Sequence, residues 1–249
     1  MQYGICHLSI VPIRFSASDQ SEMVSQLLYG EHFKILEERG KWSRIRVAFD
    51  QLEAWIDNRQ YLKLTEDQYV QLEEQGSNLS ADLFSYIIDA TGQLLPVPLG
   101  AVLNFLKPLG HSFEGEMTTD RKEKSTLINT ALLYLNSPYC WRGRSPLGID
   151  SSGFTQMVYK LNGYRLKRTS AEQATQGAPL SFIEESEPGD LAFFDNNEGI
   201  IEHVGIMMQD NHIIHVDGMV RIDRIDHSGI FNVDQKRHTH QLRVIKKII

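Results

Sequence analysis

The clearest hydrophobic pattern in the chain is a helical stripe formed by Phe154, Met157, Val158 and Leu161. Apolar residues at positions i, i+3, i+4 and i+7 predict a helix that buries one face. The polar segment Asp150-Ser151-Ser152-Gly153 comes directly before this stripe, so we expect it to form the start of the helix. Backbone N–H groups at a helix start are unpaired and carry positive partial charge, which would stabilise an anionic nucleophile there. The position suits chemistry, and Ser151 occupies it.

Before residue 65 the pattern is different, because short strand-like runs alternate with turns. The runs cover residues 4–10, 23–28, 32–37, 42–48 and 53–56. Turn signals at residues 29–31, 39–41 and 49–51 separate them. This spacing predicts a small all-β barrel in residues 1–64, which would serve as a binding or scaffolding module.

The remaining chain divides at about residue 120. Residues 65–80 are polar and are expected to form a connector, and a second β-rich stretch follows with strands at 83–88 and 102–105. From residue 121 an amphipathic helix is expected up to residue 135, ahead of the helix described above. Strands are then expected at 189–194, 203–208, 212–216, 220–225 and 243–249. Helices followed by an antiparallel sheet predict an α+β domain over residues 121–249.

Composition and charge restrict the possible functions. The net charge of −7 argues against binding nucleic acid by phosphate neutralisation. The first 15 residues contain no apolar run of signal-peptide length, and no membrane span is expected, so we expect a cytoplasmic location. Cys6 and Cys140 lie far apart in the sequence, and each is expected to be a small buried residue rather than half of a disulfide.

Two histidines flank a predicted hairpin turn. His203 and His215 are separated by a turn at residues 209–211. A three-residue loop that pairs Met208 with His212 would place both histidines on one sheet face as diagonal neighbours, within reach of each other's rings. A two-residue loop would instead send them to opposite faces.

Metal binding is a competing use of His203, His212, His215 and Asp217. Their spacing does not fall on a helix and no cysteine accompanies them, so we expect no metal site and no cofactor. His238 and His240 lie in a charged run and are expected to be solvated.

Two resemblances follow from the motifs. The segments SEMVSQLLYGE (21–31), KWSRIR (41–46) and AWI (54–56) resemble a bacterial SH3 (SH3b) domain, and residues 65–120 are interpreted as a second SH3b-like β unit with a connector. Residues 121–249 resemble the NlpC/P60 family of papain-like cysteine peptidases. The motifs are PYCWRGRSPLGIDSSGF (138–154), RTSAEQ (168–173), PGDLAFF (188–194), HVGI (203–206) and IIHV (213–216). The combination is similar to enzymes that cut γ-D-glutamyl bonds in murein peptides, including the cytoplasmic recycling type.

The resemblance implies roles for particular residues. Ser151 stands where the family has its nucleophilic cysteine, His203 matches the base, and His215 matches the residue that orients the base. Further positions that would line the peptide pocket are Tyr139, Trp141, Asp150, Ser152 and Ser170. Alternatively, Tyr139 and Trp141 are ordinary core aromatics and Asp150 caps the helix. The backbone N–H of residue 151 would contribute to an oxyanion hole in an active relative.

Four positions depart from the family pattern. A serine hydroxyl does not ionise as a thiol does, and it needs an aligned base. Arg142 replaces a glycine of the usual Trp-Gly-Gly, and Ser16 and Leu52 stand where the recycling enzymes present an acid and a tyrosine that hold the substrate amino terminus. An engineered Cys-to-Ser change would explain Ser151 alone, whereas a naturally diverged copy explains all four positions.

Three hypotheses therefore remain. The favoured one is a catalytically impaired NlpC/P60 homologue that binds a murein-derived peptide or another peptide or protein partner. The alternative is an active γ-D-glutamyl-L-diamino acid endopeptidase of murein recycling, with Ser151 as an engineered change or an unusual nucleophile. The third is an assembly adaptor that uses the barrel surfaces.

Overall fold

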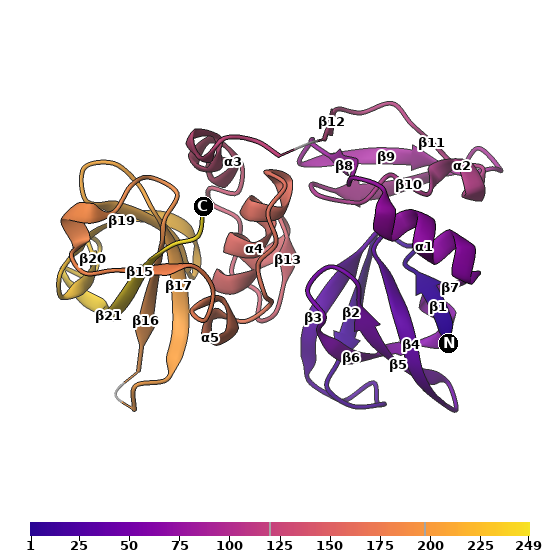
Figure 1. The fold of residues 1–249 in the computed structure, drawn as a ribbon, viewed down its shortest axis with the longest axis horizontal. Coiled ribbons are helices and arrows are strands. Elements are labelled where there is room, and N and C mark those ends of the chain that lie inside the picture. Colours follow the sequence, from indigo (N-terminus) through magenta and orange to yellow (C-terminus); the bar gives the residue numbers. More distant parts are fainter. Residues whose placement is uncertain (120, 197) are drawn as a thin grey trace. The chain divides into compact units, whose positions relative to one another are not determined.

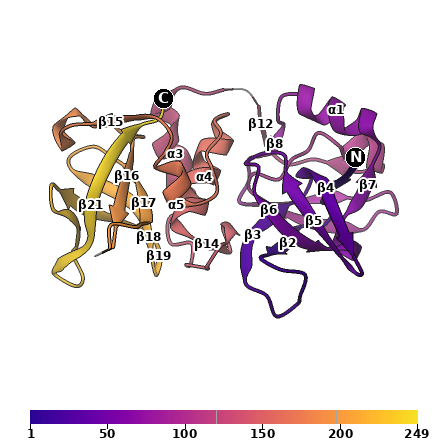
Figure 2. The same ribbon diagram turned by 60° about the horizontal axis from the view of Figure 1, so that its bottom comes forward.

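The structure is a computed structural model that describes residues 1–119, 121–196 and 198–249. The chain forms two compact units, Met1–Arg121 and Lys122–Ile249, and each is described by itself. Figures 1 and 2 show the elements of both units. Within the described residues no helix is both long and apolar enough to span a membrane.

A seven-stranded antiparallel sheet forms the first part of the first unit. Its strands are β1 (Gln2–Ile5), β2 (Ile10–Arg14), β3 (Met23–Leu28), β4 (His32–Arg39), β5 (Trp42–Val47), β6 (Glu53–Asp57) and β7 (Leu62–Leu64), with the short helix η1 (Asn58–Gln60) before β7. The strand order is β3-β2-β6-β5-β4-β1-β7. Alternate residues such as Val11, Ile13 and Ile45 point into one apolar core, as the period of two requires.

The first expected strand is interrupted in the structure. A single strand over residues 4–10 was expected, but β1 ends at Ile5 and β2 begins at Ile10. The intervening residues bond to the turn after β3 instead, since the Cys6 N–H donates to the Glu31 carbonyl and the Tyr29 N–H donates to the Ser9 carbonyl. The chain therefore changes direction between the two strands.

Residues 65–119 pack on this barrel. They form α1 (Glu66–Glu74), β8 (Leu79–Ser80), β9 (Phe84–Ile88), β10 (Leu94–Pro98), α2 (Leu106–Leu109), β11 (Ser112–Phe113) and β12 (Met117–Thr118). The strands make two small sheets, β10-β9-β11 and β12-β8. Tyr29 of the barrel shares a core with Ile87 and Val97. The interpretation of this segment as a second SH3b-like unit stays a prediction.

The strand expected at residues 102–105 is also wrong. Val102 makes an isolated bridge with Leu79, and the chain then turns into α2. Leu103 and Phe105 are buried in two different apolar clusters. Apolar residues here fill a gap between two cores, which gives the same local pattern as a buried strand.

The second unit begins with helices and continues into a sheet. The helical elements are η2 (Lys124–Thr126), α3 (Leu127–Leu132), α4 (Ser151–Leu161), α5 (Ser170–Gln173) and η3 (Ile183–Glu185). The strands are β13 (Arg144–Ser145), β14 (Gly148–Ile149), β15 (Ala178–Leu180), β16 (Leu191–Asp195), β17 (Ile201–Met207), β18 (His212–Asp217), β19 (Met219–Asp226), β20 (Gly229–Asn232) and β21 (Arg237–Lys247). Of these strands, β13, β14, β15 and β20 were not expected from the sequence.

The large sheet of this unit closes on itself. Its strand order is β15-β21-β16-β17-β18-β19-β20, and β20 also pairs with β21. The strands from β16 to β21 therefore form a small closed barrel, whose interior contains Ala192, Phe194, Met207, Ile213, Ile225 and Ile230. Helices α4 and α5 contact β17, and both lie beside that strand in Figure 1.

Candidate active site

The start of α4 is built as the sequence predicts. Asp150 is the N-cap, and its Oδ1 accepts a hydrogen bond of 2.7 Å from the Gly153 N–H. Ser151 is the first helical residue, so it lies where unpaired N–H groups and the helix dipole favour negative charge. The capping interpretation of Asp150 is confirmed.

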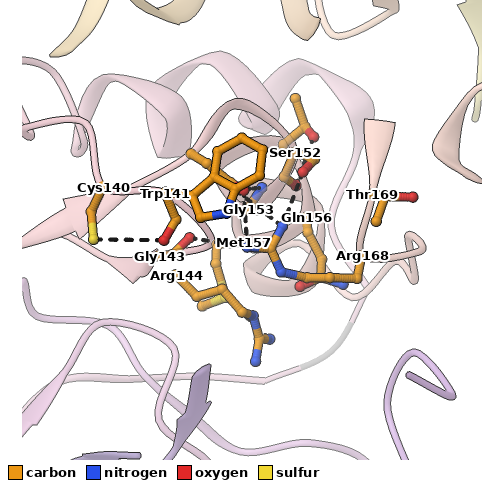
Figure 3. Close-up of polar contacts among 12 residues, drawn as sticks. Cys140, Trp141, Gly143, Arg144, Ser152, Gly153, Gln156, Met157, Arg168 and Thr169 are labelled. Atoms are coloured by element: carbon orange, nitrogen blue, oxygen red, sulfur yellow. Dashed lines mark hydrogen bonds and ion pairs between the residues drawn. The ribbon is translucent and has the colours of Figure 1, made fainter. Parts of the chain in front are cut away.

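A buried arginine bonds to side chains at this helix start. Arg168 Nη1 donates to the Ser152 hydroxyl at 2.9 Å and lies 3.0 Å from Asp150 Oδ1. Figure 3 shows the Arg168 side chain directed at this corner. Burial lowers the pKa of Arg168, and the Asp150 carboxylate opposes that shift. No role was expected for Arg168, although it stands in the RTSAEQ segment at residues 168–173.

His203 and His215 lie together on the inner face of the second barrel. The turn between β17 and β18 is the three-residue type, because the Met208 N–H donates to the His212 carbonyl. Asp210 and Asn211 take positive φ angles of 55° and 56° in that turn. The two rings meet, with His203 Nε2 and His215 Nδ1 3.0 Å apart. The predicted diagonal relationship is confirmed.

A carboxylate contacts His215 on the side away from His203. Asp223 on β19 is fully buried, and its Oδ2 lies 3.1 Å from His215 Nε2. Burial alone would raise the Asp223 pKa, but hydrogen bonds from His215 and Arg221 outweigh it and lower the pKa to about 2. Asp223 was not among the expected site residues, since nothing in the alternating pattern of β19 separates an acid that faces the barrel interior from one that faces solvent.

The ionised Asp223 determines the tautomers of both rings. It accepts from His215 Nε2–H, so the Nδ1 of a neutral His215 is an acceptor. That acceptor takes the Nε2–H of His203. The remaining nitrogen of His203, Nδ1, then carries the lone pair that a general base needs.

His240 lies against His203, although it was expected to be solvated. Its ring stacks on that of His203, with centroids 4.1 Å apart. A bulge in β21 is responsible: Phe193 pairs with Val244 but Phe194 pairs with Leu242, so Arg243 is an extra residue. The bulge reverses the side-chain alternation and turns His240 inward. His238 is exposed, as expected, and pairs with Asp226.

A cavity of about 610 Å³ lies between the start of α4 and the histidines. It is lined by Tyr139, Trp141, Arg142, Asp150, Ser151, Ser152, Thr169, Ser170, Ala171, Ile201, Glu202, His203, Val216 and His240. Of the residues expected at the site, His215 is absent from this lining because it lies behind His203, fully buried. Tyr139 and Trp141 are 46% and 52% exposed, so their interpretation as core aromatics is wrong.

Arg142 places a cation at the cavity wall. Its φ angle is +60°, in the region that favours the glycine of the family pattern. Its guanidinium lies 4.7 Å from the centre of the Trp141 ring, and its Nε is buried without a hydrogen-bond partner among the described residues. A ligand oxygen at this wall would satisfy it.

Ser151 and His203 stand at the positions expected for the nucleophile and its base. Among the described residues, the Ser151 hydroxyl has no hydrogen bond to His203, although both line the cavity. Burial and the neighbouring rings of His240 and His215 hold the pKa of His203 well below its usual range. A base with so low a pKa takes a proton from a hydroxyl poorly.

Ser16 and Leu52 lie in the first unit. Leu52 is partly buried and packs against the core of the first barrel. Ser16 is exposed, and its N–H donates to the Ser21 hydroxyl. Neither residue has the carboxylate or the phenol that the recycling enzymes present at these two positions.

Comparisons with known proteins agree with this architecture. Residues 136–241 match the NlpC/P60 family, and residues 13–60 match the bacterial dipeptidyl-peptidase Sh3 domain. A crystal structure of an NlpC/P60 family protein from Bacillus cereus has a TM-score of 0.78 at 17% identity and covers 99% of both chains. That similarity supports the fold. The chain thus contains an SH3-type segment at residues 13–60 and an NlpC/P60 segment at residues 136–241.

Its relatives carry peptidase names. The γ-D-glutamyl-L-lysine dipeptidyl-peptidase of Bacillus cereus is 34% identical over 139 residues, which are 55% of this chain and 39% of that protein. The enzyme of the same name from Bacillus subtilis is 35% identical over 36% of this chain and 30% of its own length. This chain therefore spans well under two thirds of either. Dipeptidyl-peptidase 6 of Lysinibacillus sphaericus is 28% identical over 78% of this chain and 80% of its own length.

Proposed function

We propose that the NlpC/P60 domain binds a murein-type peptide in the cavity beside Ser151 and that its hydrolytic activity is impaired. The observation that carries this is the combination at the nucleophile position. A hydroxyl stands in place of the thiol, and His203, which lines the cavity and matches the base of the family, has a pKa well below its usual range. In a cysteine enzyme the thiolate would stabilise the imidazolium, but a neutral serine cannot. Helices α3, α4 and α5 precede the large sheet of the second unit, which is the order expected of a papain-like domain.

The cavity wall supports the choice of this ligand. A γ-D-glutamyl bond leaves the α-carboxylate of the glutamate free beside the peptide link. Arg142 supplies a cation whose Nε has no hydrogen-bond partner among the described residues, and Tyr139 and Trp141 supply half-exposed aromatic faces. The names of the relatives support a γ-D-glutamyl peptide as the first ligand to test. The cytoplasmic location stays a prediction.

A second candidate is an active serine-based peptidase. The observation that favours it is a pair of linked contacts: Asp223 contacts His215, and His215 contacts His203. Contacts of this kind orient the base in other hydrolases. This candidate requires the Ser151 hydroxyl to move into contact with His203 when the ligand binds.

The test uses the full chain and L-Ala-γ-D-Glu-diamino-acid peptides. Binding is measured by calorimetry and cleavage by mass spectrometry for the natural chain, Ser151→Cys and Ser151→Ala. We expect all three to bind, the natural chain and Ser151→Ala to be inactive, and Ser151→Cys to cleave. Cleavage by the natural chain that Ser151→Ala abolishes would favour the second candidate. Absence of binding by all three would contradict the proposal and leave the adaptor hypothesis.

A further inference from the structure

Three imidazoles cluster on the inner face of the second barrel, and two of them belong to the histidine pair described above. His203, His215 and His240 each present a ring nitrogen, and these atoms lie within 4.8 Å of one another. His212 and Asp217, the other two residues considered as ligands from the sequence, are not part of this group. The bulge at Arg243 brings His240 into the cluster. We propose that these three histidines form a binding site for a borderline divalent transition-metal cation such as Zn²⁺.

The spacing of the rings fits such an ion. Zinc takes imidazole nitrogens at about 2.0–2.1 Å in tetrahedral geometry, which puts two ligand nitrogens about 3.3 Å apart. His203 Nε2 and His215 Nδ1 are already 3.0 Å apart. The ion would replace the proton that they share, and a small separation of the rings would suffice. His240, which is half-buried, would complete the set by a rotation of its ring.

Partners behind the rings orient the donor nitrogens. Asp223 accepts from His215 Nε2–H and leaves Nδ1 as the donor atom. The Thr239 hydroxyl lies 2.9 Å from His240 Nδ1, which leaves Nε2 for a ligand. Hydrogen bonds of this kind from the far ring nitrogen to an oxygen are typical of metal-binding histidines.

The chemistry of the three ligands restricts the choice of metal. An imidazole binds a metal in its neutral form, through a ring nitrogen lone pair. Neutral imidazoles select zinc, copper or nickel over magnesium or calcium, which prefer oxygen ligands.

The bound ion would lie at the wall of the peptide cavity. His203 and His240 both line that cavity, so a fourth coordination position can be taken by water or by an oxygen of the peptide. The ion would bind to His203 Nε2 and His215 Nδ1. It would thereby replace the hydrogen bond between these two atoms, which fixes the His203 tautomer. Metal binding needs no peptide and does not involve the Ser151 hydroxyl.

The test is a titration of the chelator-treated full chain with ZnCl₂ by calorimetry, and with CoCl₂ by visible absorption. We expect about one Zn²⁺ per chain and the intense bands of four-coordinate cobalt. His240→Phe keeps the stacked ring but removes the ligand, and it should weaken binding at least about tenfold. His240→Cys should retain binding, because a thiolate also ligates zinc. Ser151→Ala should bind metal normally, which separates this result from the peptide proposal.

The matched control is His238→Phe, on the same strand two residues away. His238 is exposed and pairs with Asp226, so this variant should bind zinc as the natural chain does. Circular dichroism melts verify that each variant is folded. Absence of binding to the natural chain at 100 µM-scale metal, or equal binding by His240→Phe and the natural chain, would overturn the proposal.

Discussion

His203 and His215 contact each other, with Nε2 and Nδ1 3.0 Å apart, because the residue between them on the shared face is Gly205. A Cβ at position 205 would lie 2.9 Å from the His215 Cβ and 2.7 Å from the Ile213 Cδ1. Contacts that short do not occur in folded proteins, so a side chain there would move His215. The glycine in the HVGI motif thus provides the space in which the two rings meet.

Gly205→Ala should therefore destabilise the chain by about 1–3 kcal/mol, the usual cost of overpacking a core. It should also weaken the cleavage gained by Ser151→Cys, since the base loses its orienting partner. Chemical denaturation measures the first effect and peptide turnover the second. Gly76→Ala is the control, because a Cβ there meets nothing within 4 Å. A Gly205→Ala protein as stable as Gly76→Ala would contradict this account.

Asp223→Asn removes the charge that determines both histidine tautomers. Asp223 is buried and pairs with His215 and with Arg221, whose Nε lies 2.6 Å from its Oδ2. Breaking a buried pair of this kind costs about 3–5 kcal/mol. We expect a loss of this order in the free energy of unfolding, measured with urea, and a lower kcat when the change is combined with Ser151→Cys.

The control for that variant is Asp226→Asn. Asp226 also pairs with a histidine, His238, but both side chains are exposed. Exposed pairs contribute at most about 1 kcal/mol, so the change in stability should stay within that value. If the two asparagine variants lose equal stability, the buried acid is not the structural support that we infer.

The sequence predicted the helix start and the histidine pair but not the groups that complete the site. Local signals were sufficient for Asp150, Ser151 and the hairpin, because capping chemistry and turn length act within a few residues. His240 was misplaced since its direction depends on a bulge, and a one-residue insertion leaves no mark in the composition of β21.

Residues that reach the site from distant parts of the sequence could not be predicted either. Asp223 and Arg168 reach the site through strand pairing and through the turn before α5, which no periodicity specifies. The strand expected at residues 102–105 failed for a related reason, because a short apolar run fits either a strand or a gap between two cores.

Stability should depend on pH through His240, in the absence of added metal. Its pKa in the folded chain is about 4, whereas an unfolded histidine titrates near 6.5. The unfolded state therefore binds protons first as pH falls, and stability decreases from about pH 6.5 to pH 4. His203, whose pKa is also lowered by burial, acts in the same direction.

The check is a series of urea denaturations between pH 7 and pH 4. His240→Gln should flatten this dependence, and the exposed His238→Gln should leave it as in the natural chain. Asp223, with a pKa of about 2, loses its contribution only below about pH 4, so it does not obscure this window. A His240→Gln profile parallel to that of the natural chain would show that another group is responsible.

Arg142→Gly restores the residue found in the family pattern. The φ angle of +60° costs an L-residue about 1 kcal/mol, which glycine recovers, while the contact with Trp141 loses about 0.5–1 kcal/mol. The two effects offset each other, so stability should change by less than about 1 kcal/mol. Binding of a peptide with a free glutamyl α-carboxylate should weaken about tenfold, because a charge-assisted hydrogen bond contributes about 1.5–3 kcal/mol.

The α-amide form of the same peptide separates charge recognition from shape. If the Arg142 guanidinium contacts the carboxylate, the natural chain should prefer the acid to the amide by about the same tenfold, and Arg142→Gly should bind both equally. Arg142→Lys should recover part of the preference, since lysine keeps the charge but not the planar donor pair. An acid preference that persists in Arg142→Gly would place carboxylate recognition elsewhere in the cavity, because Arg142 is then merely the residue that stacks on Trp141.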